Sequence, residues 1–282
     1  MSIIVSSCAF QTSDVDEMID IARMNGLILE FSSGIKYSPN LKEKFMETDI
    51  PRFLHNYFPP PKNPFVINLA STDEVIRSKS VRHCIQGLQL ARATGSSFFS
   101  AHAGFCIDVK PKHLGNPFPR NNQYNRDLNM SLFIDSLRQI LNVANEIGMI
   151  FCIENNVVAN FNISSKGTNP FLCADSKEIN YVFDKMKSDN LGLLFDTGHF
   201  KVSSNSLKFD LLTDTSKISD KIYAVHHNDN DGLTDTNMQL PSNYWFAEIM
   251  DSLDPSVYHV LEVKNIPVDI IKSQINFLNS KI

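Results

Sequence analysis

Four residues of the types that bind divalent metal ions end four apolar segments in the second half of the chain. Glu154, Asp196, His226 and Glu262 follow the runs MIFCI, LGLLF, IYAV and VYHVL, and successive members lie 42, 30 and 36 residues apart. Three carboxylates brought together would repel one another without a cation, and oxygen ligands with one imidazole suit Mn²⁺, Mg²⁺, Co²⁺ or Zn²⁺. The pattern predicts one divalent ion bound by these four side chains.

Each residue taken alone has a simpler explanation. An acid that ends a strand often caps the next helix, and Asp196 stands directly before Thr197 and Gly198. A single histidine such as His226 is more often a hydrogen-bonded structural residue than a ligand. The shared placement of four such residues, each about one strand-and-helix unit from the next, favours the metal site.

The elements that must position these residues are short apolar runs alternating with longer amphipathic runs. Near-continuous apolar runs are typical of strands buried on both faces of a parallel sheet. Helices are expected to start near residues 14–16, 71–74, 132, 176 and 267 and to end near 24, 91, 147, 186 and 278, with Gly148 as a C-cap. The predicted strands are Ile3–Cys8, Leu27–Phe31, Phe53–Tyr57, Ser97–His102, Met149–Glu154, Leu191–Asp196, Ile222–His226 and Val257–Glu262.

Eight such units in 282 residues favour one closed (β/α)8 barrel, an α/β fold with a single domain over residues 1–282. In such a barrel the carboxyl ends of all strands meet at one face, which is where active sites are built. No GxGxxG motif follows the first strand, which argues against dinucleotide binding. Two long loops, Pro59–Asn63 and Gly104–Asp127, exceed what the scaffold needs and are expected to be functional or disordered.

Composition points to an enzyme that acts on a small molecule. The net charge is −5, whereas proteins whose main partner is a nucleic acid usually carry a basic footprint, so no nucleic-acid partner is expected. The sequence contains no run of about 18 apolar residues, so no membrane span is expected. The segment MSIIVSSCAF does not resemble a signal peptide. The five scattered cysteines fit reduced thiols in a cytoplasmic protein.

Several motifs around the four residues resemble those of the xylose-isomerase-like barrel superfamily. They are IEN (153–155), LFDTGH (194–199), HHND (226–229) and LEVK (261–264), together with FVINLAS (65–71) and SAHAGF (100–105). Members of that superfamily include sugar-phosphate isomerases and epimerases, ketose 3-epimerases, inosose dehydratase and, more distantly, endonuclease IV. The resemblance implies that Glu154, Asp196, His226 and Glu262 bind one metal ion. It also implies a homo-oligomer, because dimers or tetramers are common among these proteins.

The activity implied by this resemblance is isomerisation or epimerisation of a sugar. Such a reaction removes a proton next to a carbonyl, and two carboxylates on opposite sides of that carbon can act as base and acid. A metal ion that bridges the carbonyl and hydroxyl oxygens would stabilise the enediolate. Glu154 and Glu262 are the candidates for this acid and base catalysis. A lyase resembling inosose dehydratase is an alternative with the same chemistry, and a barrel that binds sugar without turnover is a third.

Two differences from known members of the superfamily limit the range of expected substrates. Ketose 3-epimerases carry an arginine shortly after the histidine of the seventh strand, where this chain reads HHNDNDGLTD, and a second glutamate where it has Asn160. These differences argue against 3-epimerisation of a free ketose. The sequence leaves open whether the sugar is phosphorylated or otherwise acidic. Endonuclease IV has an Asp-x-His pair where this chain has Asp235-Thr236-Asn237, so its three-metal cluster and its action on abasic DNA are not expected here.

Further polar residues are predicted to contact substrate. They are His55 and His102 at the ends of the third and fourth strands, His199 in the DTGH motif, Glu30 at the end of the second strand, and Lys264 in LEVK. The first two histidines could instead bind metal, His199 could touch a second ion, and Glu30 could orient a ligand. His227 should face away from the site. The basic residues of the two long loops could bind a phosphate or remain solvated: Lys62, Lys110, Lys112, Arg120 and Arg126.

Overall fold

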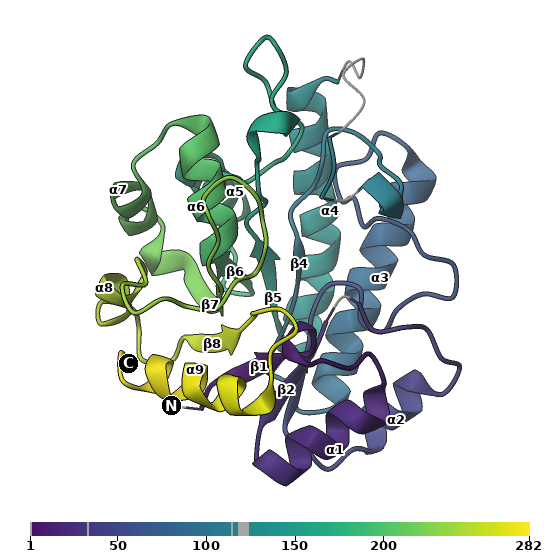
Figure 1. Cartoon of the computed structure of the whole chain (residues 1–282). Coiled ribbons are helices and arrows are strands. Elements are labelled where there is room, and N and C mark those ends of the chain that lie inside the picture. The colour runs from purple at the N-terminus through teal and green to yellow at the C-terminus, as the bar shows by residue number, and fades with distance from the viewer. Residues whose placement is uncertain (1, 33, 114, 118–123) are drawn as a thin grey trace.

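Eight parallel strands form the centre of the molecule, and helices surround them (Figure 1). The computed structural model describes residues 2–32, 34–113, 115–117 and 124–282. The strand order is β3-β2-β1-β8-β7-β6-β5-β4, and a parallel bridge between His55 and Ser100 joins the two end strands into a nearly closed barrel. The predicted (β/α)8 fold is confirmed. The strands are β1 Ile4–Ser6, β2 Ile28–Phe31, β3 Arg52–Leu54, β4 Phe98–His102, β5 Ile150–Glu154, β6 Leu191–Asp196, β7 Ile222–His227 and β8 Tyr258–Leu261.

The helices that the sequence predicted are α1, α3, α4, α5 and α9, and all of them are present. Asp14 caps α1 by accepting hydrogen bonds from the backbone of Asp16 and Glu17, and Gly148 ends α4 at a φ of 65°. The sequence did not predict α2, α6, α7 or α8. The helix bounds are α1 Val15–Asn25, α2 Leu41–Glu47, α3 Glu74–Ala93, α4 Arg126–Ile147, α5 Ser176–Met186, α6 Thr197–Leu207, α7 Leu211–Ser216, α8 Ala247–Met250 and α9 Val268–Asn279.

The third strand is shorter than predicted, which changes how His55 is held. The strand β3 ends at Leu54, and Asn56 takes a left-handed conformation with a φ of 53°. That conformation turns the chain out of the sheet, so the ladder cannot continue to Tyr57. His55 therefore lies just beyond the strand, at the mouth of the barrel, with its backbone still bridged to Ser100 of β4.

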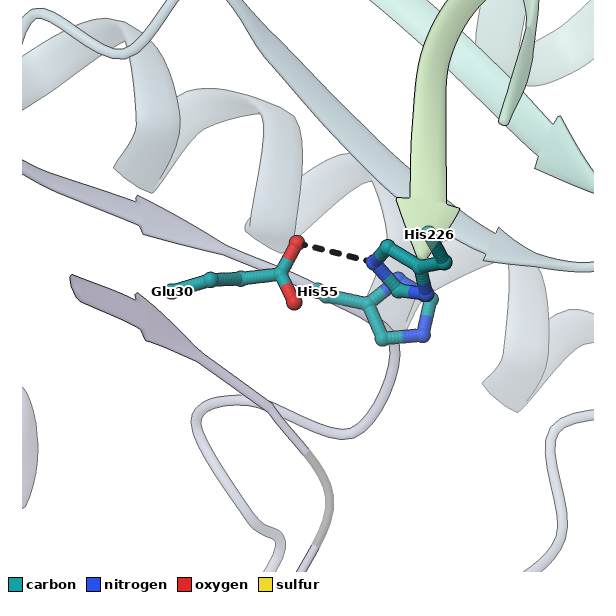
Figure 2. Close-up of side chains that lie close together, drawn as sticks. All are labelled: Glu30, His55 and His226. Carbon is teal, nitrogen blue, oxygen red and sulfur yellow. Dashed lines mark hydrogen bonds and ion pairs between the residues drawn. The ribbon is translucent and has the colours of Figure 1, made fainter. Parts of the chain in front are cut away.

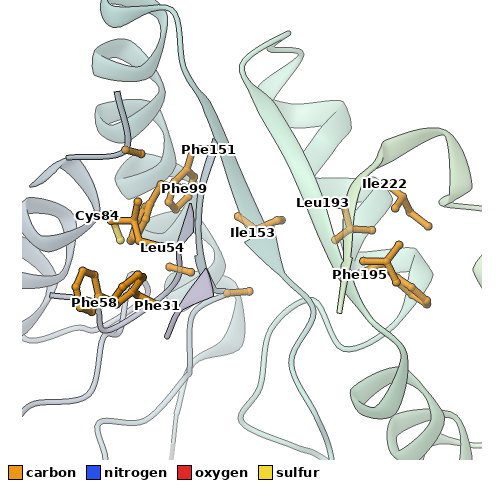
Figure 3. Packing of buried hydrophobic residues seen from close by; sticks show 14 of the residues in the cluster. Phe31, Leu54, Phe58, Cys84, Phe99, Phe151, Ile153, Leu193, Phe195 and Ile222 are labelled. Atoms are coloured by element: carbon orange, nitrogen blue, oxygen red, sulfur yellow. The ribbon is translucent and has the colours of Figure 1, made fainter. Parts of the chain in front are cut away.

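Side chains along each strand alternate between the barrel interior and the surrounding helices. On β5, Phe151 and Ile153 belong to the large outer core that packs under the helices (Figure 3), whereas Cys152 belongs to the interior cluster. Aromatic rings fill the interior below the mouth: the ring centroids of Phe98 and Tyr258 lie 5.3 Å apart. This filling leaves the carboxyl ends of the strands as the place where polar side chains can gather.

The described residues were compared with two expectations from the sequence, which concern membrane spans and cysteine thiols. None of their helices is both long enough and apolar enough to cross a membrane. All five cysteines are described, and each is a free thiol.

Because α3 packs closely on β4, we predict that a side chain larger than glycine at position 87 destabilises the protein. A Cβ atom there would lie 2.5 Å from the Phe99 ring, which is fully buried and has no room to move. We expect Gly87→Val to lower the free energy of unfolding by about 1–3 kcal/mol through overpacking. The exposed neighbour Gln86 provides the matched variant Gln86→Val, which should cost only about 0.5 kcal/mol of helix propensity. Chemical denaturation measures both, and equal stabilities would contradict this account of the packing.

Candidate metal centre

The structure brings together the four residues predicted to bind metal. Glu154 and Asp196 end β5 and β6, His226 lies next to the last residue of β7, and Glu262 directly follows β8. One ligand atom from each lies within 4.8 Å of all the others. The side chains of Glu154, Asp196 and His226 are almost completely buried, and that of Glu262 is 14% exposed. Their role as ligands stays a prediction, but their convergence is a property of the fold.

The contacts within this group are close but poorly aligned for hydrogen bonding. His226 Nδ1 lies 2.9 Å from Glu262 Oε2, 3.5 Å from Glu154 Oε1 and 3.9 Å from Asp196 Oδ2. Even so, His226 Nδ1 and Glu154 Oε2 are buried polar atoms without a hydrogen-bond partner. Buried polar atoms are nearly always satisfied, so the unsatisfied nitrogen of His226 and oxygen of Glu154 need a different partner. The donor set therefore fits a divalent cation.

Electrostatics inside the group support the same interpretation. Burial, together with the carboxylates of Glu262 and Glu154, raises the pKa of Asp196 to about 8 against an opposing effect of His199. A carboxyl with that pKa holds a proton at neutral pH because three anions cannot share the site. A bound cation would remove that penalty and allow all three carboxylates to ionise.

Asp196 is both a helix cap and a member of the donor group. Its Oδ1 accepts a hydrogen bond from the His199 backbone N–H at 2.7 Å, and Asn228 Nδ2 donates to its Oδ2 at 2.8 Å. The Asn155 side chain holds its backbone by bonding to both its N–H and its carbonyl. A Cβ atom on Gly198 would lie 1.8 Å from Asn228 Oδ1, which explains the glycine of the DTGH motif.

Glu30 lies behind the centre and orients His226. Figure 2 shows its carboxylate reaching from β2 toward the imidazole at the end of β7, with the ring of His55 alongside. His226 Nε2 donates to Glu30 Oε1 at 3.2 Å, which leaves Nδ1 facing the other donors. Glu30 is completely buried, so of the two roles predicted for it the structure favours orienting a ligand over contact with substrate.

His55 and His102 meet the other side of Glu154. His55 Nε2 lies 3.3 Å and His102 Nδ1 lies 3.1 Å from Glu154 Oε2, and the three residues form a second group with metal-binding geometry. Ser100 Oγ bonds to His55 Nδ1 at 2.8 Å and so sets the orientation of that ring. Burial lowers the pKa of His102 to about 4, which keeps the ring neutral and able to bind a metal ion or a substrate hydroxyl.

His199 contacts an acid that the sequence did not assign to the site. Its Nδ1 donates to the Asn155 carbonyl at 3.0 Å, and its Nε2 lies 3.2 Å from Asp235 Oδ2. Asp235 comes from the loop after β7, where only the comparison with an Asp-x-His motif had drawn attention to it. Ser100, Asn155 and Asn228 were also missed as positioning residues, although the two asparagines belong to the IEN and HHND motifs.

Those of the remaining predicted residues that the structure describes belong to none of the donor groups. Lys264 is exposed and lines a cavity that also contains Glu262. Arg126 is committed to Glu178 at 2.7 Å and to backbone carbonyls, so it braces the loop instead of offering a free cation. Arg120 lies outside the described residues, whereas three loop lysines are exposed: Lys62, Lys110 and Lys112.

His227 occupies the outer face of β7, as the sequence predicted. Its Nδ1 bonds to the hydroxyl of Tyr244 at 3.0 Å, and its Nε2 bonds to His259 Nδ1 at 2.8 Å. Burial, with the neighbouring histidines His259 and His226, lowers the pKa of His227 well below its usual value. The ring is therefore neutral and serves as a structural bridge between β7, β8 and the following loop.

The two roles of Asp196 can be separated by mutation. Asparagine is as good a helix cap as aspartate, so Asp196→Asn should keep α6 folded while removing a charged ligand. Loss of a partner that only orients a ligand costs about 10- to 100-fold in metal affinity, so we expect loss of this carboxylate to cost at least about 100-fold. Metal analysis after loading with Zn²⁺, Mn²⁺ or Co²⁺ measures the effect.

Asp175 provides the matched control, because it caps α5 through the Glu178 backbone N–H at 2.9 Å and lies outside the donor groups. The variant Asp175→Asn should retain the metal content of the unaltered protein. Equal metal content in the two variants would show that Asp196 only caps its helix.

Comparison with known proteins places these observations in a family. Residues 28–281 match the model of a protein family that is described as "Xylose isomerase-like TIM barrel". A curated relative, the uncharacterized protein MJ1311 of Methanocaldococcus jannaschii, is 23% identical over 225 residues, which cover 77% of this chain and 69% of the relative.

Solved structures share the fold over essentially the whole chain. A D-tagatose 3-epimerase-like protein has a TM-score of 0.71 at 19% identity, with 100% of this chain and 97% of that one covered. The 3-keto-D-glucoside 4-epimerase YcjR of E. coli, in its apo form, has 0.68 at 14%, with 100% and 98% covered. A Thermus thermophilus protein, TTHB071, soaked with ZnCl2, has 0.65 at 17%, with 99% of each chain covered. Because the family model matches residues 28–281 and the chain folds as a barrel, the chain belongs to the xylose isomerase-like TIM barrel family.

Proposed function

We propose that the protein is a metal-dependent sugar isomerase or epimerase. The observation that carries this proposal is the group formed by Glu154, Asp196, His226 and Glu262 at the mouth of the barrel, with two glutamates among four converging donors. Two structural neighbours, a D-tagatose 3-epimerase-like protein and a 3-keto-D-glucoside 4-epimerase, support sugar chemistry on this fold.

The four donors would hold the ion, and Glu30 and Asn228 would orient two of them. A divalent ion bound there would polarise the carbonyl and hydroxyl oxygens of a sugar and offset the negative charge that develops when a proton leaves the neighbouring carbon. The neighbour soaked with ZnCl2 supports a metal on this fold without identifying the metal of this chain.

The two glutamates would move the proton. Burial raises the pKa of Glu154, but the imidazoles of His102 and His55 bring it well below its usual value, and His226 has the same effect on Glu262. Both carboxylates are therefore ionised and able to accept a proton. Glu262 lines a cavity and can reach a substrate there, whereas Glu154 is buried and enclosed by His55 and His102.

The proposal also covers the class of substrate, the alternative dehydration reaction and the cellular compartment. The absence of an arginine after His226 and the presence of Asn160 instead of glutamate favour a substituted sugar over a free ketose. A dehydratase would begin with the same proton removal and then expel a hydroxyl group, so product analysis distinguishes the two reactions. Five unpaired thiols suit a reducing compartment such as the cytoplasm.

Exchange of substrate hydrogen in D₂O tests the reaction class. The metal-loaded protein should introduce deuterium at the carbon next to the carbonyl of a responsive sugar, and removal of the metal should stop the exchange. We expect Glu154→Gln and Glu262→Gln each to reduce the exchange rate by about 100-fold or more, because each removes a proton-transfer group. The exposed Glu248 of α8 provides the control Glu248→Gln, which should retain full exchange. Exchange that survives both active-site substitutions would exclude the assigned roles.

A second candidate function follows from the second donor group. His55, His102 and Glu154 could hold another ion, which would share Glu154 with the first, and His199 with Asp235 offers two further donors. Paired metal ions can activate water and stabilise the leaving oxygen of a phosphodiester. This arrangement favours a phosphodiesterase resembling endonuclease IV as the alternative, although Asn237 stands where that family has histidine.

Metal stoichiometry and DNA cleavage discriminate between the two candidates. We expect about one tightly bound ion per chain and no incision of a labelled duplex that contains an abasic site, even at low salt where phosphate contacts are strongest. The variant His102→Ala should leave the stoichiometry unchanged. Two or more ions per chain, with incision that is lost in His102→Ala and His199→Ala, would replace the sugar enzyme with the nuclease.

A further inference from the structure

Two cavities of similar size open beside the candidate metal centre, and apolar surface predominates more strongly in the first than in the second. The first has a volume of about 620 Å³, and its lining includes His102, His199 and Asp235. The second has a volume of about 560 Å³, and its lining includes Glu262 and Lys264. Both cavities share Gly34 and Ile35 as a wall, so they lie next to each other at the mouth of the barrel.

The donor groups connect the two cavities. His102 at the first cavity lies 3.1 Å from Glu154, and Glu154 lies 3.5 Å from His226. His226 in turn lies 2.9 Å from Glu262 at the second cavity. The donor groups therefore lie between the two cavities, with His102 lining the first and Glu262 lining the second.

The first cavity has mainly apolar and aromatic walls. They include Tyr57, Phe65, Phe105, Phe161 and three prolines of the loop after β3. Two polar groups of the lining are already used inside the protein: the Tyr57 hydroxyl accepts from the Ile67 N–H, and Asn156 Nδ2 donates to three backbone carbonyls. Asn56, Asn162 and Thr234 also line this cavity, but apolar surface predominates, and such walls can pack against an aromatic ring.

The second cavity has the groups that a polyol needs. Its lining includes Ser7, Gln11, Thr12, Asn237 and Lys264, besides the carboxylate of Glu262. A sugar that occupied this cavity would leave the apolar one for a part of the substrate that is not sugar. The volume of about 620 Å³ falls in the range of roughly 300–1,000 Å³ that is typical of sites for drug-sized ligands.

We propose that the substrate is a sugar bearing an aromatic substituent, with the sugar in the polar cavity and the aromatic ring in the apolar one. This inference rests on the proposed sugar isomerase or epimerase function and names the substrate class of that site.

Matched ketohexoses test the inference through turnover. A panel of ketohexoses, each as the free sugar, the 6-O-methyl ether and the 6-O-benzyl ether, retains the carbonyl and changes only the substituent. Deuterium exchange by the metal-loaded protein should show kcat/KM for the benzyl ether at least about tenfold above that for the methyl ether, as burial of one aromatic ring allows. Equal values for the two ethers would overturn the proposal.

Two variants act on the cavity in opposite ways. Phe161→Ser removes a wall residue that is 37% exposed and whose loss the fold can tolerate, and Val157→Trp fills the cavity. Both should reduce the benzyl-to-methyl ratio toward one. Tyr181 of α5, exposed and outside the cavity, provides the control Tyr181→Ser, which should keep the ratio. An unchanged ratio in both cavity variants would also overturn the proposal.

A sugar-free probe separates this inference from the proposed function. Binding of 4-nitrophenol, followed by its absorbance, reports on the apolar cavity alone, and we expect Val157→Trp to abolish it. If 4-nitrophenol binds in that way but no sugar shows exchange, the proposed function fails while the aromatic site stands. If sugars show exchange but 4-nitrophenol does not bind, the aromatic assignment fails and the proposed function stands.

Discussion

The mutual repulsion of buried carboxylates at the mouth of the barrel is the constraint on which the rest of the site depends. Glu154, Asp196 and Glu262 are held within a few ångströms of one another by strands that cannot move apart. Burial and the neighbouring anions raise the pKa of Asp196 to about 8, so without a cation the site has to bind a proton. The fold thus maintains an arrangement that is unfavourable by itself and that a bound divalent ion would stabilise.

Positioning groups behind the donors prevent the site from relaxing away from this arrangement. Glu30 fixes the ring of His226, Asn228 and the N-terminus of α6 fix the carboxylate of Asp196, and Ser100 fixes His55. Gly198 is needed because any side chain there would displace Asn228. Each of these contacts fixes a rotamer, and the result is a set of ligand atoms that needs little reorganisation when an ion enters.

The residues that surround the candidate metal centre differ between its two sides, whereas the donor residues do not. On the side of β1 and β8 the lining is polar and contains Glu262 and Lys264, whereas on the side of β3 to β5 it is aromatic and proline-rich. The rings of Phe53, Phe98 and Tyr258 pack together in the interior below, so the donors lie at the mouth of the barrel. In enzymes built on such barrels, residues at the strand ends and the loops that follow them form the active site together, and the candidate site has the same arrangement.

The sequence by itself determined the barrel and the convergence of Glu154, Asp196, His226 and Glu262. Alternating apolar runs specify parallel strands, and in a parallel barrel every strand ends at the same face, so a local pattern is enough to bring distant residues together. It did not reveal α6, because Thr197–Leu207 contains a glycine and several serines and is buried around much of its surface, which removes the usual amphipathic stripe.

Only the tertiary structure decided which side chains meet these four. Glu30 and His226 are 196 residues apart, and His55 reaches Glu154 because the chain leaves β3 at Asn56 instead of continuing the strand. Asp235 approaches His199 from a loop, and the two cavities arise where loops after different strands pack together. These contacts depend on packing across the barrel and on loop conformation, which are not encoded in any single stretch of residues, whereas the strand ends are.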